Sequence, residues 1–306
     1  MRAILAQPRG FCAGVERAIR IVEATLERYG APVYVRHEIV HNRHVVEALG
    51  AKGAVFVKEV DEIPRGAVTI FSAHGVSESV EESARTRGLS IIDATCPLVE
   101  KVHKEAQRFA SQGRTVILIG HRGHPEVEGT SGRVKGGVVL VSTVEEVEQL
   151  QVENSTDLAY VTQTTLSVDD TREVIKALRR RFPRIVGPDL RDICYATQNR
   201  QDAVKQLALE SDFIIVIGSR NSSNSSRLKE LAEKCGVVSI LIDGIKEIDF
   251  KAISKYKKIG VTAGASAPET VVQEVVTTLC DKLDAKVQEI GKNKEDIYFK
   301  LPPELR

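Results

Sequence analysis

The chain has 306 residues, 42% of them hydrophobic, and its 43 Lys and Arg nearly balance its 42 Asp and Glu, which leaves a formal net charge of +1. This length predicts two or three domains with hydrophobic cores of their own, and the near-zero charge, with 8 Phe, 6 Tyr and no Trp, argues against a nucleic-acid binder. No apolar run approaches the roughly 20 residues of a membrane span, and the apolar stretch at the N-terminus is too short for a secretory signal. We therefore expect a cytoplasmic protein that binds neither nucleic acid nor a membrane, in which cysteines act as ligands or catalysts more often than as disulfide partners.

Short apolar runs of strand length alternate with amphipathic stretches of helix length along the chain. In chain order, helices are expected at 13–29, 77–87, 97–112, 168–181, 195–209, 226–235 and 267–283, and strands at 67–71, 115–119, 158–161, 213–217, 239–242 and 258–261. This alternation predicts an α/β fold with mostly parallel sheets. The charged tail at 284–306 contains two consecutive prolines and is expected to be an extended C-terminal arm.

Three kinds of turn recur at a period of roughly 90 residues, which suggests an internal repeat. The three sets are Cys12, Cys96 and Cys194; His41, His124 and Ser222; and Ser72, Thr162 and Thr262. We expect three similar α/β lobes at 13–96, 97–193 and 194–283, with residues 1–12 contributing near the centre. In open α/β sheets ligands bind at the carboxyl ends of the strands, so three lobes around a pseudo-threefold axis would place all these turns at one central site.

The cysteines of the first set each precede an expected helix start. The positive end of a helix stabilises a thiolate, which is the form that ligates metal. None of the three belongs to a CxxC pair, which excludes zinc ribbons and ferredoxin-type runs. Three thiolates suit either three irons of a four-iron cluster, with the fourth iron free for substrate, or a three-cysteine zinc site. Cys235 and Cys280 lie late in expected helices and fit small buried apolar residues.

Histidines and a Ser/Asn run form a second group of candidates. His41, His74 and His124 lie in turns, where a single histidine is usually solvated or capping but three together suit a metal or an anion. The Ser/Asn run at 221–226 precedes an expected helix and resembles an anion cradle, although one of its serines is needed as the helix cap. Ser266 opens a Ser-Ala-Pro-Glu capping box and is therefore either a cap or a ligand. The P-loop motif is absent, so a nucleotide site of that kind is not expected.

Seven separated motifs resemble those of the bacterial 4-hydroxy-3-methylbut-2-enyl diphosphate reductases, iron–sulfur enzymes of the non-mevalonate isoprenoid route. They are Gly-Phe-Cys-Ala-Gly-Val at 10–15, Ile-Asp-Ala-Thr-Cys-Pro at 92–97, His-Pro-Glu-Val at 124–127, Thr-Gln-Thr-Thr at 162–165, Ile-Cys-Tyr-Ala-Thr at 193–197, Asn-Ser-Ser-Asn-Ser at 221–225 and Thr-Ala-Gly-Ala-Ser-Ala-Pro at 262–268. The resemblance runs from about residue 4 to the C-terminus, without a departure at the family's functional positions.

This resemblance implies three α/β lobes around one oxygen-sensitive [4Fe-4S] cluster per chain, with Cys12, Cys96 and Cys194 as metal ligands. It implies reductive removal of the hydroxyl of an allylic diphosphate, giving isopentenyl and dimethylallyl diphosphate, with electrons from a donor such as flavodoxin or ferredoxin. The implied catalytic residues are Glu126 as proton donor, Thr164 and His124, and the implied substrate-binding residues are His41, His74, His124, Thr164, Ser222, Ser223, Asn224 and Ser266. Without the resemblance, Glu126 would be read as a carboxylate favoured by the dipole of a helix first turn.

Two other functions fit parts of the pattern. Another three-cysteine iron–sulfur enzyme, quinolinate-synthase-like or a hydro-lyase on a carboxylate substrate, would favour Arg or Tyr at the anion pocket, where this chain offers His, Ser and Asn. A non-enzymatic metal or redox sensor would need neither the Ser/Asn run nor a glutamate beside His124, and it would show no turnover.

Overall fold

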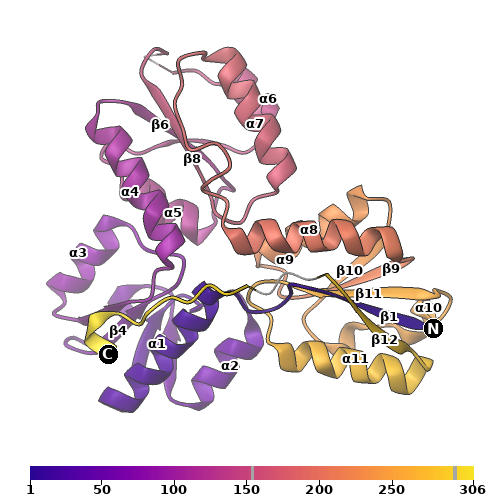
Figure 1. Cartoon of the computed structure of the whole chain (residues 1–306). Coiled ribbons are helices and arrows are strands. Elements are labelled where there is room, and N and C mark those ends of the chain that lie inside the picture. Colours follow the sequence, from indigo (N-terminus) through magenta and orange to yellow (C-terminus); the bar gives the residue numbers. More distant parts are fainter. Residues whose placement is uncertain (153–154, 292–294) are drawn as a thin grey trace. The chain divides into compact units, whose positions relative to one another are not determined.

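In the computed structural model of the chain, which describes residues 1–152, 155–291 and 295–306, the strands form three separate parallel sheets (Figure 1). The predicted α/β class with parallel sheets is therefore confirmed. The predicted arm at 284–306 and the predicted lobe at 97–193 each include a few residues that lie outside the described ones. Among the described residues, no helix combines the length and apolar character that a membrane span requires.

Contacts divide the chain into two units, each built from segments that are distant in sequence. The first unit comprises Met1–Glu16, His41–Glu47 and Tyr195–Tyr298, and the second comprises Arg17–Val40, Ala48–Cys194 and Phe299–Arg306. The predicted limits of three lobes around an axis stay a prediction.

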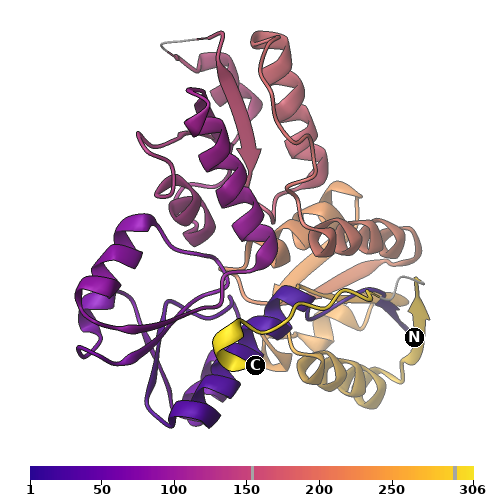
Figure 2. The same cartoon turned by 60° about the vertical axis from the view of Figure 1, so that its left-hand side comes forward.

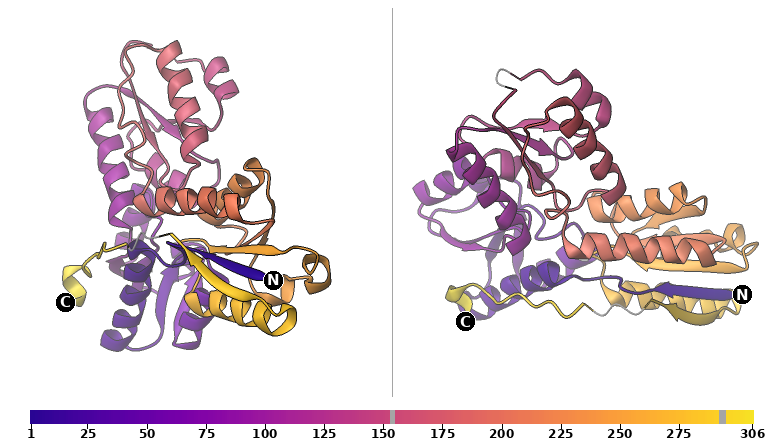
Figure 3. Two further views of the ribbon diagram at one scale, coloured as in Figure 1. Left: turned by 45° about the vertical axis from the view of Figure 1, so that its right-hand side comes forward. Right: turned by 45° about the horizontal axis from the view of Figure 1, so that its top comes forward.

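The first unit contains a five-stranded sheet with helices on both faces. Its strand order is β10 (Val238–Ile242), β9 (Phe213–Ile217), β11 (Lys258–Ala263), β1 (Arg2–Ala6) and β12 (Lys286–Ile290). The helices are α8 (Tyr195–Glu210) and α9 (Ser223–Lys234) on one face and α11 (Glu269–Leu283) with the short α10 (Phe250–Ile253) on the other (Figure 3). A 3-10 turn, η2 (Ile245–Glu247), precedes α10. Because β9 is covered on both faces, its sequence Phe-Ile-Ile-Val-Ile is buried at every position, as expected for a central parallel strand.

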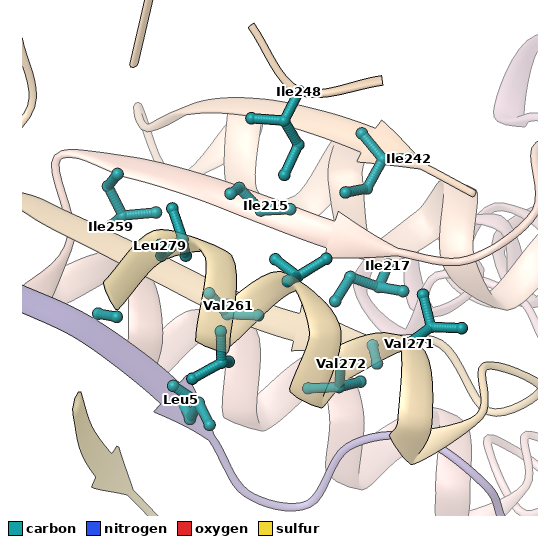
Figure 4. Packing of buried hydrophobic residues seen from close by; sticks show 14 of the residues in the cluster. Leu5, Ile215, Ile217, Ile242, Ile248, Ile259, Val261, Val271, Val272 and Leu279 are labelled. Carbon is teal, nitrogen blue, oxygen red and sulfur yellow. The ribbon is translucent and has the colours of Figure 1, made fainter. Parts of the chain in front are cut away.

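Alternate residues of these strands pack against α11. Ile215 and Val261 point to this face and meet Val272 and Leu279 of the helix in one cluster of buried side chains (Figure 4). Burial of this kind contributes roughly 1.5–3 kcal/mol for each large aliphatic side chain. It fixes the strand ends from which the site loops leave.

Within the predicted arm, Lys286–Ile290 form a strand that was not predicted, β12, which lies at the sheet edge and pairs in register with β1. Four of its five residues are exposed, so the segment lacks the apolar alternation that would have predicted a strand. The N-terminal strand β1 was likewise not among the predicted strands.

The second unit contains two smaller sheets. The four-stranded sheet has the order β3 (Ala54–Val57), β2 (Val33–Arg36), β4 (Val68–Phe71) and β5 (Ser90–Asp93), and the three-stranded sheet has the order β7 (Val139–Val141), β6 (Thr115–Ile119) and β8 (Leu158–Thr162). The connecting elements are α1 (Ala13–Tyr29), α2 (Arg43–Ala51), η1 (Val60–Glu62), α3 (Glu78–Thr86), α4 (Pro97–Ser111), α5 (Pro125–Ser131), α6 (Val144–Gln149), α7 (Val168–Arg181) and η3 (Pro303–Leu305), of which α1 and α2 begin in the first unit.

The three-stranded sheet separates two layers of helix. Helices lie on both sides of this sheet (Figure 2). Val116 and Leu118 face α4 and α5, whereas Ile117 and Ile119 face α6 and α7. This strict alternation along β6 is the period-2 pattern of a strand that is covered on both sides.

Candidate active site

The predicted site residues follow the carboxyl ends of parallel strands in both units. In the second unit, His74 follows β4, His124 follows β6 and Thr164 follows β8. In the first unit, Cys12, Ser222 and Ser266 follow β1, β9 and β11 respectively. This is the edge at which open α/β sheets bind their ligands.

Glu126 and Thr164, which are far apart in the sequence, are brought together within the second unit. The backbone N–H of Thr164 donates to Oε1 of Glu126 at 2.6 Å, and the Thr164 hydroxyl donates to Oε2 at 3.0 Å. Both residues are almost fully buried, with exposed fractions of 2% and 4%. The carboxyl group of Glu126 is therefore held by both oxygens at the end of β8.

The surroundings of Glu126 favour its neutral form. Its pKa is raised from 4.5 to about 7, mainly by burial. The two hydrogen bonds from Thr164 lower the pKa, and the nearby carboxylate of Asp192 raises it. Burial also raises the pKa of Asp192, although Asp192 accepts bonds from Thr162 N–H and Lys101. A carboxylic acid that titrates near neutral pH is suited to give up and regain a proton.

His124 is the N-cap of α5 and orients its ring with its own helix. Its Nδ1 accepts from the backbone N–H of Glu126 at 3.2 Å. Since a backbone N–H can only donate, the neutral ring carries its proton on Nε2 and presents that nitrogen as a donor. His74 lies edge-on to His124 with ring centroids 6.0 Å apart, and its Nδ1 lies 3.2 Å from the Ser72 hydroxyl.

The turn that carries His74 has no room for a side chain at its next residue. Gly75 adopts a φ of +78°, and a Cβ there would lie 2.5 Å from Cε1 of the buried His103. A positive φ and the missing Cβ both require glycine. The close packing fixes the position of His74.

The Ser/Asn run begins its helix earlier than predicted. Helix α9 starts at Ser223 instead of Ser226, because Ser222 is the N-cap and its hydroxyl accepts from the N–H of Ser225 at 3.4 Å. Ser223 lies half-buried in the first turn, whereas Asn224 is buried and its Oδ1 accepts from the backbone N–H of Ala265 at 2.9 Å. The run therefore supplies a cap, a first-turn hydroxyl and an amide that joins two site loops.

The interpretation of Ser266 as a helix cap is wrong. Helix α11 starts at Glu269 with Pro268 as its N-cap and no side-chain cap. The buried Ser266 hydroxyl instead donates to the backbone oxygen of His41 at 2.8 Å. Within the first unit, Ser266 and His41 are therefore neighbours.

Each predicted cysteine ligand is hydrogen-bonded through its backbone N–H to a turn that carries a predicted substrate-binding residue. Cys12 donates to the oxygen of Ala265, beside Ser266, at 3.2 Å; Cys96 donates to Ala73, beside His74, at 3.0 Å; and Cys194 donates to Thr164 at 3.0 Å. Two of these cysteines belong to the second unit and one to the first.

The donor set suits an iron–sulfur cluster. All three cysteines are reduced and partly exposed, and each directly precedes a helix. Reduced thiols at positive helix ends readily lose their protons to a metal. The described residues hold no preformed group of three His, Cys, Asp or Glu ligands, so the joint site of the three cysteines stays a prediction.

The other two cysteines lie apart from the predicted site. Cys235 is the C-cap residue of α9 and is exposed, which corrects the expectation of a buried apolar residue. Cys280 lies on α11 and packs, partly buried, against the core.

Two buried charged residues near the cysteine loops were not predicted. Asp192 has a fully buried side chain paired with Lys101 at 3.1 Å, and Arg200 is fully buried on α8. The sequence does place a charged residue within a few positions of each cysteine. Charges at such spacings are common on solvent-exposed helices, so this pattern alone did not indicate that Asp192 and Arg200 are buried.

Comparisons with known proteins identify the family. The family model of the LytB protein matches residues 3–280. The 4-hydroxy-3-methylbut-2-enyl diphosphate reductase of Zymomonas mobilis is 57% identical over 306 residues, covering 100% of this chain and 90% of that protein. The reductase of Dechloromonas aromatica is 58% identical over 305 residues, covering 100% of both.

Solved structures give the same result. The E-1-hydroxy-2-methyl-but-2-enyl-4-diphosphate reductase of Plasmodium falciparum has a TM-score of 0.96 and 37% identity, covering 99% of this chain and 96% of that one. A second structure, of (E)-4-hydroxy-3-methyl-but-2-enyl diphosphate reductase, the terminal enzyme of the non-mevalonate pathway, has a TM-score of 0.64 and 33% identity, covering 92% of this chain and 100% of that one. The chain therefore belongs to the LytB family, the family of the 4-hydroxy-3-methylbut-2-enyl diphosphate reductases.

Proposed function

We propose that the chain reductively dehydroxylates 4-hydroxy-3-methylbut-2-enyl diphosphate to isopentenyl diphosphate and dimethylallyl diphosphate. The reaction breaks the allylic C–O bond, consumes two electrons and two protons, and releases the hydroxyl as water. The observation that carries the proposal is the buried Glu126–Thr164 pair, because hydroxide is a poor leaving group and needs a proton at the moment it departs.

The electron-transfer chemistry requires a bound cofactor, for which Cys12, Cys96 and Cys194 are the proposed ligands, with one [4Fe-4S] cluster per chain. When bound, such a cluster supplies electrons one at a time and an iron without a protein ligand that acts as a Lewis acid on the substrate oxygen. The reduced state and the helix-start positions of the three cysteines support this assignment.

Glu126 is the proposed proton donor. Its carboxyl group with a pKa of about 7 is protonated in a large part of the molecules at neutral pH. Thr164 fixes the direction of the carboxyl group through its N–H and its hydroxyl, and this hydroxyl is proposed to position the substrate hydroxyl or a relay water. The Nε2–H of His124 is a second donor in the same unit, which we assign to the substrate.

The diphosphate is proposed to bind through neutral donors and histidines. The proposed residues are His41, His74, His124, Ser222, Ser223, Asn224 and Ser266. Hydroxyl, amide and imidazole groups, together with the start of α9, donate to phosphate oxygens without a cluster of arginines. This chemistry explains how a chain with a net charge of +1 holds a polyanion.

The remaining assignments concern the setting of the reaction. We assign the chain to the cytoplasm and its electrons to a small donor protein such as flavodoxin or ferredoxin. The three predicted lobes, 13–96, 97–193 and 194–283, are proposed to surround the site.

The proposal is tested by anaerobic turnover with a reduced viologen. We expect the allylic diphosphate to oxidise two equivalents of viologen, with formation of the two isomeric products. Inorganic diphosphate should compete with the substrate, and the free allylic alcohol should be a far poorer substrate. Absence of turnover by a cluster-loaded protein would favour a sensor. If the free alcohol were turned over as fast as the diphosphate, or if inorganic diphosphate did not compete, the anion pocket would be misassigned.

A further inference from the structure

Each of the three helices that follow a predicted cysteine ligand carries a cation one and a half turns further on. Arg17 on α1 comes five residues after Cys12, Lys101 on α4 five residues after Cys96, and Arg200 on α8 six residues after Cys194. The structure shows that each of these cations reaches the loop before another cysteine.

Arg17 binds the loop that precedes Cys96. Its Nη1 donates to the backbone oxygens of Thr95 at 3.0 Å and of Ala94 at 3.4 Å. Its Nε donates to the oxygen of Lys300 at 2.9 Å, which ties the C-terminal segment of the second unit to the same side chain.

Lys101 binds the loop that precedes Cys194. Its Nζ donates to the backbone oxygen of Arg191 at 2.8 Å and to Oδ1 of Asp192 at 3.1 Å. The other carboxylate oxygen of Asp192 accepts from the N–H of Thr162 at 3.2 Å, at the end of β8. The ammonium group is the most exposed of the three cations, since 46% of the Lys101 side chain is accessible.

Arg200 binds the loop that precedes Cys12, and it is fully buried. Its Nη2 donates to the backbone oxygens of Gly10 at 2.7 Å and Phe11 at 3.2 Å. Glu295 holds the other side of the guanidinium with both carboxylate oxygens, at 2.9 and 3.1 Å. A bidentate arginine–carboxylate pair of this kind has a fixed geometry.

For Cys96 and Cys12, hydrogen bonds hold both the C=O and the N–H of the peptide group that precedes the cysteine. The Thr95 oxygen is held by Arg17 while the N–H of Cys96 in the same peptide group donates to Ala73. The Phe11 oxygen is held by Arg200 while the N–H of Cys12 donates to Ala265. Because a peptide group is planar, holding both of its ends fixes the orientation of the plane and the position of the next Cα. A helix begins directly after each of these cysteines and limits the remaining rotation about the N–Cα bond, so the contacts help to orient the cysteine side chains.

We propose that Arg17, Lys101 and Arg200 are positioning residues for the three cysteine ligands, and that they act in a cyclic order. The cation after Cys12 sets the loop of Cys96, the cation after Cys96 sets the loop of Cys194, and the cation after Cys194 sets the loop of Cys12. The inference rests on the proposed role of these cysteines as cluster ligands, but the contacts that carry it involve the protein alone. Preorganised ligands of this kind lower the cost of binding a metal group.

The test measures the rate at which each thiol of the full-length, cluster-free chain is alkylated, by mass spectrometry of every cysteine peptide. Arg17→Met should speed labelling of Cys96, and Arg200→Met should speed labelling of Cys12, each by about tenfold, since a hydrogen bond to a charged group is lost. Lys101→Met should speed labelling of Cys194 by a smaller factor because Lys101 is half-exposed. Lys104→Met, which removes an exposed cation paired with Glu100 on the same helix α4, is the matched control and should change none.

The cyclic order distinguishes positioning from a general loss of stability. A merely structural role would speed labelling of all thiols together, including the core-packed Cys280, or would act on the cysteine that begins the same helix. Either result overturns the proposal, as does an unchanged pattern. If Arg200→Met fails to fold, Glu295→Gln loosens the same guanidinium and should again speed labelling of Cys12.

A second readout uses the cluster-loaded chain. Arg17→Met and Arg200→Met should release iron to a chelator faster than the parent chain does, whereas Lys104→Met should not. Failure of the parent chain to take up a cluster would count against the proposed function, and the labelling pattern would still decide the role of the cations.

Discussion

Replacing Glu126 by glutamine separates proton delivery from binding. In the parent chain, both oxygens of Glu126 accept from Thr164, at 2.6 Å from its N–H and at 3.0 Å from its hydroxyl. Glutamine keeps an oxygen for the N–H, but its amide must donate to the Thr164 hydroxyl, which then accepts instead of donating. The variant keeps the shape of the site and cannot give up a proton at useful pH.

The expected loss of turnover is about 10²–10⁴-fold, the usual contribution of general acid catalysis. Substrate should still bind with its C–O bond intact, and Glu126→Asp should lie between the two because it keeps the acid but withdraws it by one methylene. Turnover of the parent chain should fall as pH rises through about 7, because Glu126 then loses its proton.

The same pKa predicts how the unfolding free energy depends on pH. Since the folded-state pKa of Glu126 is raised from 4.5 to about 7, its protonation stabilises the fold below about pH 4.5, and that stabilisation is lost as pH rises through about 7. At 1.36 kcal/mol per pKa unit, the loss in the cluster-free chain is about 3 kcal/mol. Glu126→Gln does not titrate, so its stability relative to the parent should improve by this order between pH 5 and pH 8.

Denaturant unfolding across this pH range and anaerobic turnover are the two assays. Glu128→Gln, in the same helix turn but exposed, is the matched control and should change neither quantity. Near-parental turnover of Glu126→Gln would return Glu126 to the role of a helix first-turn carboxylate and transfer proton delivery to His124 or water. If the difference in unfolding free energy between Glu126→Gln and the parent did not change with pH, the argument that burial raises the pKa of Glu126 would be wrong.

Three further changes test other parts of the site. Replacing any predicted cysteine ligand, for example Cys96→Ser, should abolish cluster assembly and turnover, whereas Cys280→Ser should keep both, as iron and sulfide counts will show; a full cluster in the first variant would contradict the ligand assignment. Asn224→Ala, which removes the acceptor for the Ala265 N–H, should raise KM by about tenfold, the effect of losing a good hydrogen bond, and leave the cluster spectrum unchanged; an unchanged KM would remove Asn224 from the anion pocket. Gly264→Ala places a Cβ against the buried Ser225 hydroxyl and should lower the unfolding free energy by about 1–3 kcal/mol in chemical denaturation, whereas parental stability would show that this loop relaxes.

The sequence predicted the long amphipathic helices and the central strands well. Helices at 13–29 and 168–181 and strands at 115–119 and 213–217 match the structure residue for residue. These segments bury one or two faces, so the period of their hydrophobic residues reflects their environment. The family resemblance is confirmed by the matched family model and by relatives at 57% and 58% identity.

The misses have physical reasons that local patterns do not contain. Edge strand β12 is held by backbone pairing with β1 and exposes its side chains, so it carries no hydrophobic alternation. The start of α9 was misplaced because several consecutive Ser and Asn residues are equally good caps. The Arg200–Glu295 pair joins residues that are far apart in the chain, and only the fold brings them together.

The most direct test of the account is an iron and sulfide count of the anaerobically prepared chain, combined with electron paramagnetic resonance of its reduced form with and without the allylic diphosphate. The account predicts about four irons and four sulfides per chain, as a [4Fe-4S] cluster requires, and a signal that shifts when the diphosphate is added. Zinc in place of iron would contradict the account, as would a reduced cluster whose signal does not change when the allylic diphosphate is added.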